Sequence, residues 1–175
     1  AYLKANFPHE FMTATLNFSI DRTDKIISLK QELEKFNISF LKPDINFSKE
    51  KFSIEKNNDS EKKIRFGLSA IKGVGAKSIK SVISARQNKG KYKSVIDFLK
   101  RVDADVINKR QLEKLIQSGS FDSIQKNRSK LFFNVPQFVN LFGSSNNNLN
   151  QNLLFEEEEI SFDDKNLFQQ NIYEW

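Results

Sequence analysis

The stretch SAIKGVGAKSIKSVISAR (residues 69–86) places two glycines between two segments with helical periodicity. After the glycines, Ile79, Val82 and Ile83 repeat at the i, i+3, i+4 spacing that is typical of an amphipathic helix. The residues before the glycines show a shorter version of the same pattern. The stretch therefore predicts a helix, a tight Gly-Val-Gly turn, and a second helix that begins at about Ala76.

A Gly-x-Gly turn lets backbone N–H groups approach a ligand closely, because neither glycine carries a Cβ atom. The next helix starts at the same point, so its unpaired first N–H groups and positive dipole end face the same ligand. This is the helix-hairpin-helix arrangement, which holds a nucleic-acid phosphate without reading bases. The alternative is a turn that only joins two helices, since a lone Gly-x-Gly is a common pattern. The candidate phosphate-binding residues are Gly73, Val74, Gly75, Lys77, Ser78 and Lys80, with Val74 turned inward to hold the two helices together.

The basic residues are concentrated around this turn. The chain has 175 residues and a net charge of +6, but residues 62–130 contain 18 Lys and Arg against 5 Asp and Glu. This basic centre between acidic flanks is what a phosphate-tracking surface requires, although a lysine-rich solvated face is an equally consistent interpretation. The residues expected to form a supporting basic face are Lys72, Arg86, Arg101, Lys109 and Arg110.

A second helix pair follows the first. SVIDFLKRV (94–102) has Ser94 and Asp97 at capping-box spacing, and NKRQLEKLIQSG (108–119) has Asn108 as a cap and Gly119 at the C′ position. No glycines mark the turn between these two helices. We therefore expect the second pair to be a structural repeat that supports the first, and the two pairs to pack as a four-helix unit.

The rest of the chain predicts a mainly α fold with a small β portion. Pro8 is expected to start one helix, and Thr23 to cap a second helix through Lys35. The alternation in FSIE and KIRFGL predicts strands, and Pro136 should weaken or kink a late helix. The expected organisation is a helical region at 1–39, a β segment at 40–67, the tandem helix-hairpin-helix unit at 68–123, a helix at 124–143 and an acidic, Asn-rich linker or tail at 144–175.

Several classes of protein are disfavoured. The chain has no cysteine and one histidine, so it offers no disulfide framework and no Cys/His metal site. Asp103 and Asp105 could meet a metal on a turn, but a cap or solvated turn is the favoured interpretation, and we predict no cofactor and no catalytic residue here. No stretch is long enough to span a membrane, and no secretory signal is present, which favours the cytoplasm. The chain begins with Ala1 and not with Met, so we expect it to start inside a longer protein.

Five segments occur in a characteristic order: AYLKANFPHEFMTATL (1–16), DK (24–25), FLKPDINFS (40–48), IRFGLSAIKGVG (64–75) and NKRQLEKLIQSGSFDSI (108–124). This series, over roughly residues 1–130, resembles the C family of bacterial replicative DNA polymerases, the polymerase III alpha subunits. The resemblance implies the end of the fingers followed by a tandem helix-hairpin-helix region that holds template-primer duplex DNA by its backbone. It also implies a parent nucleotidyltransferase whose catalytic aspartates and two magnesium ions lie upstream, and whose partners are other polymerase domains and replisome subunits.

Two alternatives to this function stay open: a stand-alone helix-hairpin-helix DNA-binding protein, and an interaction module whose basic patch binds an acidic protein. Within the tail, Gln151, Leu154 and Phe155 have the outline of the short peptides that bind bacterial sliding clamps. Because the match is only five residues long, a flexible tail that docks on its own domain is the favoured interpretation of Gln151–Phe155.

Overall fold

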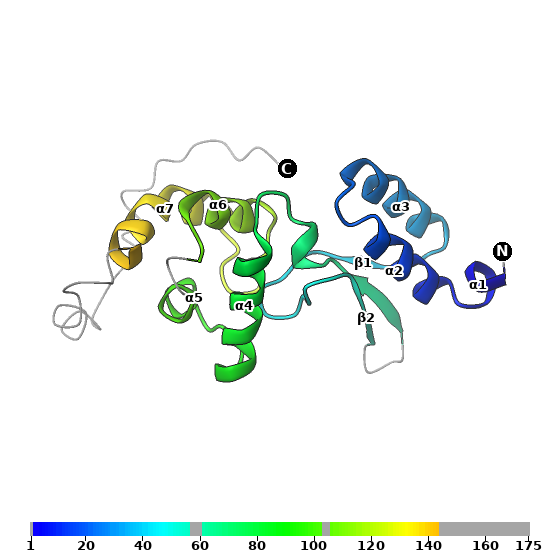
Figure 1. The fold of residues 1–175 in the computed structure, drawn as a ribbon, viewed down its shortest axis with the longest axis horizontal. Coiled ribbons are helices and arrows are strands. Elements are labelled where there is room, and N and C mark those ends of the chain that lie inside the picture. The colour runs from blue at the N-terminus through cyan, green and yellow to red at the C-terminus, as the bar shows by residue number, and fades with distance from the viewer. Residues whose placement is uncertain (1, 57–60, 103–105, 144–175) are drawn as a thin grey trace.

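The computed structural model describes residues 2–56, 61–102 and 106–143. It confirms the predicted class, because helices dominate these residues and the strands form one small sheet. The molecule is elongated, with the first helices at one end and α7 at the other (Figure 1). In chain order the elements are α1 (Tyr2–Asn6), α2 (Pro8–Phe18), α3 (Thr23–Lys35), β1 (Phe40–Leu41), β2 (Ser53–Lys56), β3 (Lys62–Arg65), the 3₁₀ turn η1 (Leu68–Ala70), α4 (Ala76–Lys89), α5 (Val95–Arg101), α6 (Lys109–Gln117) and α7 (Arg128–Gly143).

The sheet has the strand order β1-β3-β2, with β1 parallel and β2 antiparallel to β3. Ile54 pairs with Ile64 in the register, so the two side chains share one face, as the alternating pattern predicts. The helices α2 and α3 pack beside this sheet and bury a first apolar cluster, which we call the sheet core. Its buried members are Met12, Leu16, Ile26, Leu33, Ile38, Phe52 and Ile64.

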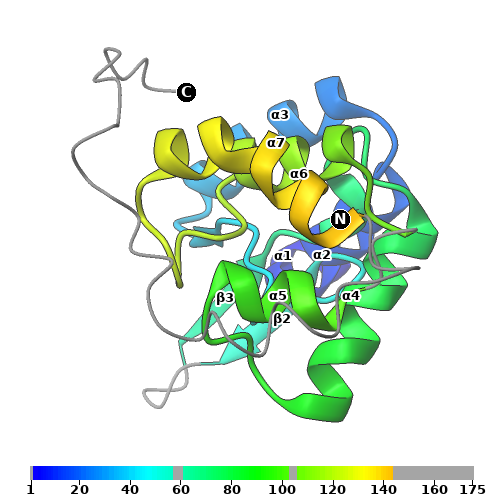
Figure 2. The ribbon, with the colours of Figure 1, turned by 90° about the vertical axis from the view of Figure 1, so that its left-hand side faces the viewer.

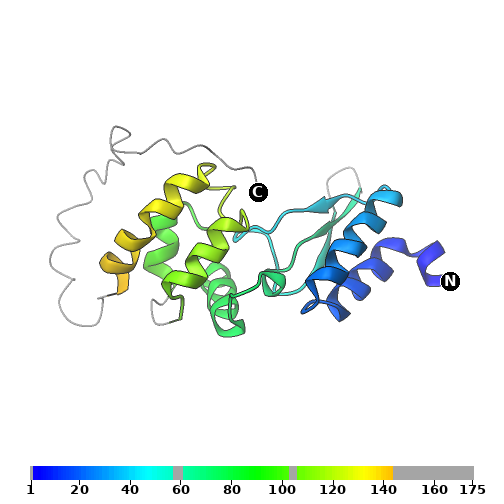
Figure 3. The same ribbon diagram turned by 90° about the horizontal axis from the view of Figure 1, so that it is seen from above.

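A second and larger cluster, the helical core, lies among η1 and α4–α7. When the molecule is seen end-on, α6 and α7 lie side by side above α4 and α5 (Figure 2). From above, the two parts are joined by the segment between β1 and β2 and by the segment that follows β3 (Figure 3). Phe66, which directly follows β3, packs against both cores.

The helix ends follow the local sequence signals, with one exception. Ser94 accepts a hydrogen bond from the Asp97 backbone N–H at 3.0 Å, and Asn108 and Gln111 form a reciprocal capping box. Gly119 has φ +78°, and the N–H groups of Gly119 and Ser120 donate to the Ile116 and Leu115 carbonyls, which is a Schellman ending. These three predictions are confirmed.

The exception is Thr23, which is the first residue of α3 and not its cap. Arg22 occupies the N-cap position in an extended conformation, and its side chain caps no N–H group. Pro8 does begin α2, as predicted. The helix α7 runs through Pro136, which cannot supply an N–H group to the turn before it.

None of the helices in the described part of the chain is long and apolar enough to cross a membrane. The tail segment Gln151–Phe155 and the pair Asp103 and Asp105 lie outside the described residues.

Candidate nucleic-acid interface

The Gly-Val-Gly turn joins η1 to α4, and the two glycines have different conformations. Gly73 has φ +86°, a region that side chains with a Cβ atom rarely adopt. Gly75 has φ −74° and ψ 151°, and forms the N-cap of α4. Only Gly73 therefore needs to be glycine for its backbone conformation.

The segment before the turn is shorter than predicted, since it forms one 3₁₀ turn and not an amphipathic α-helix. Gly67, before this turn, packs closely on another segment, because a Cβ atom there would overlap the backbone of Lys51 and lie 2.6 Å from the Phe52 nitrogen. The chain is extended at Gly67 (ψ 138°) and again at Ile71 (ψ 109°), which leaves room for a single helical turn between them.

Val74 points away from the solvent and belongs to the helical core, with 9% of its surface exposed. Gly73, Gly75, Ala76 and Lys77 around it are exposed. The turn is thus held from inside by one apolar side chain, while its glycine backbone faces the solvent.

The first turn of α4 leaves its backbone donors open. Gly75 supplies no side-chain cap, and the N–H groups of Ala76, Lys77 and Ser78 have no acceptor within the described parts of the chain. The corresponding turn of α6 differs, because the Asn108 side chain accepts from the Gln111 N–H at 3.0 Å. Of these two helix ends, α4 therefore offers an anion one more open donor in its first three residues.

Three lysines surround the exposed turn. Lys72, Lys77 and Lys80 are exposed, and none of them has an ion-pair partner among the residues that the structure describes. Lys77 and Lys80 are three residues apart on α4 and therefore share one face of the helix. The open N–H groups and these ammonium groups together suit a phosphate group.

The first turn of α6 lies beside the first turn of α4. The Ser78 hydroxyl is 3.0 Å from the Gln111 Oε1 atom, and a Cβ atom at Gly75 would lie 3.3 Å from the Gln111 side-chain nitrogen. Lys109 and Arg110, on the same turn of α6, are exposed. Lys109 is 3.9 Å from the Glu113 carboxylate.

Ser78, a predicted phosphate-binding residue, takes part in the exposed turn through its backbone and not through its side chain. Its side chain is buried and its hydroxyl donates to the Val106 carbonyl at 2.6 Å. The hydroxyl therefore joins α4 to the second hairpin, and only the backbone N–H of Ser78 belongs to the exposed turn.

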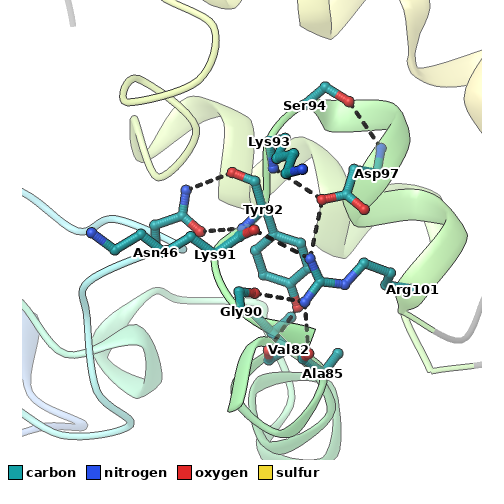
Figure 4. Close-up of polar contacts among 10 residues, drawn as sticks. All are labelled: Asn46, Val82, Ala85, Gly90, Lys91, Tyr92, Lys93, Ser94, Asp97 and Arg101. Atoms are coloured by element: carbon teal, nitrogen blue, oxygen red, sulfur yellow. Dashed lines mark hydrogen bonds and ion pairs between the residues drawn. The ribbon is translucent and has the colours of Figure 1, made fainter. Parts of the chain in front are cut away.

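Arg86 and Arg101 were predicted for the supporting basic face, but both guanidinium groups form hydrogen bonds inside the molecule. Arg86 donates to the Ile45 carbonyl at 2.6 Å and the Ser48 carbonyl at 2.9 Å, and burial lowers its pKa. Arg101, whose side chain is 7% exposed, donates to Asp97 and to three backbone carbonyls (Figure 4). It also lies 4.5 Å from the Tyr92 ring centroid. We therefore leave both arginines out of the proposed basic face.

Sequence reasoning missed two contributors from α6, Gln111 and Lys114. The Lys114 side chain lies along the turn, where a Cβ atom at Gly73 would be 3.3 Å from its Cγ atom. Its ammonium group donates to Gln117 at 3.0 Å. The contacts of Gln111 and Lys114 with the turn and with α4 join residues that are 33 to 41 positions apart, so no local sequence pattern predicts them.

No group of three or more His, Cys, Asp or Glu side chains that could hold a metal ion occurs in the described residues. The turn offers backbone donors and ammonium groups to an anion, and the described residues contain no carboxylate cluster of the kind that metal-dependent chemistry uses.

Comparison with known proteins agrees with this geometry. The chain is 40% identical to DNA polymerase III subunit alpha of Neisseria meningitidis serogroup A and 41% identical to that of Borreliella burgdorferi, over 89% of this chain in each case. It is 41% identical to the subunit of Chlamydia trachomatis over 73% of its length. These relatives confirm the resemblance seen in the sequence, although the chain spans only 13% of the first two and 10% of the third. A family model described as the helix-hairpin-helix motif matches residues 37–131, which is more than half of the chain. The chain therefore belongs to the helix-hairpin-helix family.

Proposed function

We propose that this chain is the segment of a replicative DNA-directed DNA polymerase that holds duplex DNA by its backbone during DNA replication. The observation that carries the proposal is the uncapped start of α4, where open N–H groups follow a glycine turn and three exposed lysines surround it. The similarity to polymerase III alpha subunits supports the polymerase context. Contacts with phosphates position a protein on DNA and carry no base sequence.

The contact is assigned to the Gly73 and Gly75 backbone, the first N–H groups of α4, and the ammonium groups of Lys77 and Lys80. Lys72, Lys109 and Arg110 flank this contact as a supporting basic face. Val74 acts from inside by fixing the turn.

Binding to two blunt duplexes of unrelated sequence, measured at several salt concentrations, tests this assignment. Lys77→Ala and Lys80→Ala should weaken both duplexes equally, and each should lower the magnitude of the log-log salt slope by about 1. Lys30→Ala is the control, because Lys30 is also exposed but lies on α3. If both α4 variants keep the salt slope of the parent, the proposal is wrong.

The chemistry of nucleotide transfer is assigned to residues outside this chain, together with the magnesium ions that such chemistry uses. Polymerases need carboxylates that place two metal ions, and the described residues lack such a cluster. The purified chain should therefore add no nucleotide to a primed template in the presence of magnesium. Metal-dependent primer extension by the purified chain would contradict this part of the proposal.

The proposed partners are duplex DNA, the other polymerase domains and replisome subunits, in the bacterial cytoplasm. A bacterial sliding clamp is a further candidate partner, which would bind the segment Gln151–Phe155. The competing interpretation is that this segment docks on the chain itself. Titration of a peptide of this segment against a bacterial clamp separates the two. Binding at sub-millimolar concentration, lost when Leu154 and Phe155 are replaced by Ala, supports the clamp, and the absence of binding removes it.

A further inference from the structure

Phe47 is an exposed aromatic side chain on an otherwise buried turn. Asp44, Ile45, Asn46 and Ser48 are between 0 and 9% exposed, whereas Phe47 is 45% exposed. A turn that buries its other residues and leaves a phenyl ring in the solvent holds that ring where a ligand can reach it.

The turn is fixed by hydrogen bonds to distant elements. The Ser48 hydroxyl accepts from the Asp44 N–H at 2.9 Å and donates to the Phe66 carbonyl at 2.7 Å. Arg86 donates to two carbonyls of the turn, those of Ile45 and Ser48. The Ile45 N–H donates to the Ser120 carbonyl at 2.9 Å. The position of the Phe47 backbone is therefore set before any ligand binds, which lowers the entropy cost of binding.

Cations surround the ring. The Lys91 ammonium lies 3.9 Å from the ring centroid, and the Arg65 guanidinium carbon lies 5.7 Å from it. Arg65 is held by Glu55 and by the Lys42 carbonyl. Lys91 is exposed and has no ion-pair partner in the described part of the chain, so its flexible stem lets the ammonium leave the ring for a phosphate.

Lys91 lies on a basic loop that is also rigid. Lys89, Lys91 and Lys93 are exposed, and the backbone of residues 90–93 is held by Arg101, Asp97 and Asn46 (Figure 4). This loop follows the C-terminal end of α4, whereas the glycine turn precedes its N-terminal end. The 14 residues of α4 separate these two ends by about 20 Å.

We propose that Phe47 and Lys91 form a contact for single-stranded DNA, in which a base stacks on the Phe47 ring and Lys91 binds an adjacent phosphate. A ring with neighbouring cations is the combination that binds single strands with little sequence preference. The faces of the bases in a duplex interior are covered by the neighbouring pairs, so the ring favours an unpaired strand. This contact is separate from the duplex contact at the glycine turn.

The test compares binding of the full chain to an oligo-dT strand and to a blunt duplex, by fluorescence anisotropy. Phe47→Ala should weaken binding to oligo-dT by about fivefold or more, because stacking on an aromatic side chain contributes at least about 1 kcal/mol per base. It should leave the blunt duplex unchanged, and Phe47→Tyr should keep the affinity for oligo-dT. Phe18→Ala is the matched control, because Phe18 is 91% exposed but lies at the end of α2.

Equal binding of oligo-dT by the parent and by folded Phe47→Ala would overturn the proposal, and so would an equal loss on both ligands. If circular dichroism shows that Phe47→Ala does not fold, the proposal is tested with Lys91→Gln, by measuring its salt slope for oligo-dT. Loss of one phosphate contact should lower the salt slope for oligo-dT by about 0.7, and an unchanged slope overturns the proposal. Failure of the parent to bind the blunt duplex would contradict the proposed duplex function alone.

Discussion

The side chain of Asn46 and the backbone of Tyr92 are joined by two hydrogen bonds. Asn46 Nδ2 donates to the Tyr92 carbonyl at 2.9 Å, and the Tyr92 N–H donates to Asn46 Oδ1 at 2.7 Å. Both residues are buried and are separated by 46 positions in the sequence. This pair fastens the turn that carries Phe47 to the loop that follows α4.

Asn46→Ala should lower the free energy of unfolding by about 2–6 kcal/mol. The substitution leaves a buried N–H and a buried carbonyl of Tyr92 without partners, and each such group costs about 1–3 kcal/mol. Urea unfolding followed by circular dichroism measures the change. Asn88→Ala, at an exposed position of α4, is the control and should shift the free energy by less than about 0.5 kcal/mol. Equal stability of the Asn46 variant and the control would contradict the role assigned to the pair.

The hydroxyl of Tyr92 predicts a loss of stability at high pH. This hydroxyl donates to the Val82 carbonyl at 2.7 Å, and burial raises the pKa of Tyr92 to about 12. In the unfolded chain a tyrosine ionises near pH 10, so between about pH 10 and 12 the unfolded state binds fewer protons. The Tyr92 hydroxyl therefore contributes fully to the free energy of unfolding below about pH 10. This contribution is lost as the pH rises through the pKa of the folded state.

The measurement is the free energy of unfolding of the parent and of Tyr92→Phe at pH 8, 9, 10 and 11. The parent should be the more stable below pH 10, and its advantage should shrink at pH 11. Tyr2→Phe, which removes an exposed hydroxyl, should follow the curve of the parent. A difference between parent and Tyr92→Phe that stays constant over this range would show that the hydroxyl does not titrate as its burial implies.

Local signals predicted the helix ends, whereas the role of several side chains depends on contacts between distant segments. Ser94, Asn108 and Gly119 act on backbone groups within a few residues, so their function is encoded in short patterns. Arg101 instead donates to carbonyls 10 to 16 residues away, and every residue has a carbonyl. For this reason, no sequence pattern shows which carbonyl groups an arginine side chain will bind.

The helical periodicity of α4 could have corrected the predicted roles of the Ser78 and Arg86 side chains. Ser78, Val82 and Arg86 are four residues apart along α4 and so lie on one stripe of the helix. Because Val82 is buried, its neighbours on that stripe face the core as well. Lys77 and Lys80 lie off this stripe and are exposed. Charge alone suggested that Arg86 belonged to the basic face, but the periodicity of the helix decides its direction.

Arg101→Met should destabilise the protein by about 2–4 kcal/mol without changing how it binds DNA. The substitution removes the charge-assisted bond to Asp97 and the donors for the Ala85 and Gly90 carbonyls, and hydrogen bonds to charged groups contribute about 1.5–3 kcal/mol. The exposed neighbour Lys100→Met should change the stability little. At a temperature where the Arg101 variant is folded, its salt slope for duplex DNA should equal that of the parent. A slope lower by about 1 would mean that Arg101 does reach a phosphate.

The two glycines of the turn should respond differently to substitution by alanine. Gly73 has φ +86°, so Gly73→Ala should cost about 1–2 kcal/mol of stability, because an L-residue is strained there. Gly75 has φ −74°, which alanine adopts without strain, and its new Cβ atom would meet the Gln111 side-chain nitrogen at 3.3 Å. Gly75→Ala should therefore keep most of the stability, yet weaken duplex binding, since the Cβ atom lies where a phosphate approaches the first N–H groups of α4.

Urea unfolding and binding to two unrelated duplexes, measured on the same samples, separate these effects. Gly90→Ala is the control for strain, because Gly90 has φ +77° but has no neighbouring atom within 4 Å and lies at the far end of α4. Because its ψ is −173°, it should lower stability at least as much as Gly73→Ala, and it should leave the affinity for duplex DNA unchanged. If Gly75→Ala is folded and binds both duplexes as tightly as the parent, the glycines form only a tight turn, and the phosphate must bind elsewhere on the basic face.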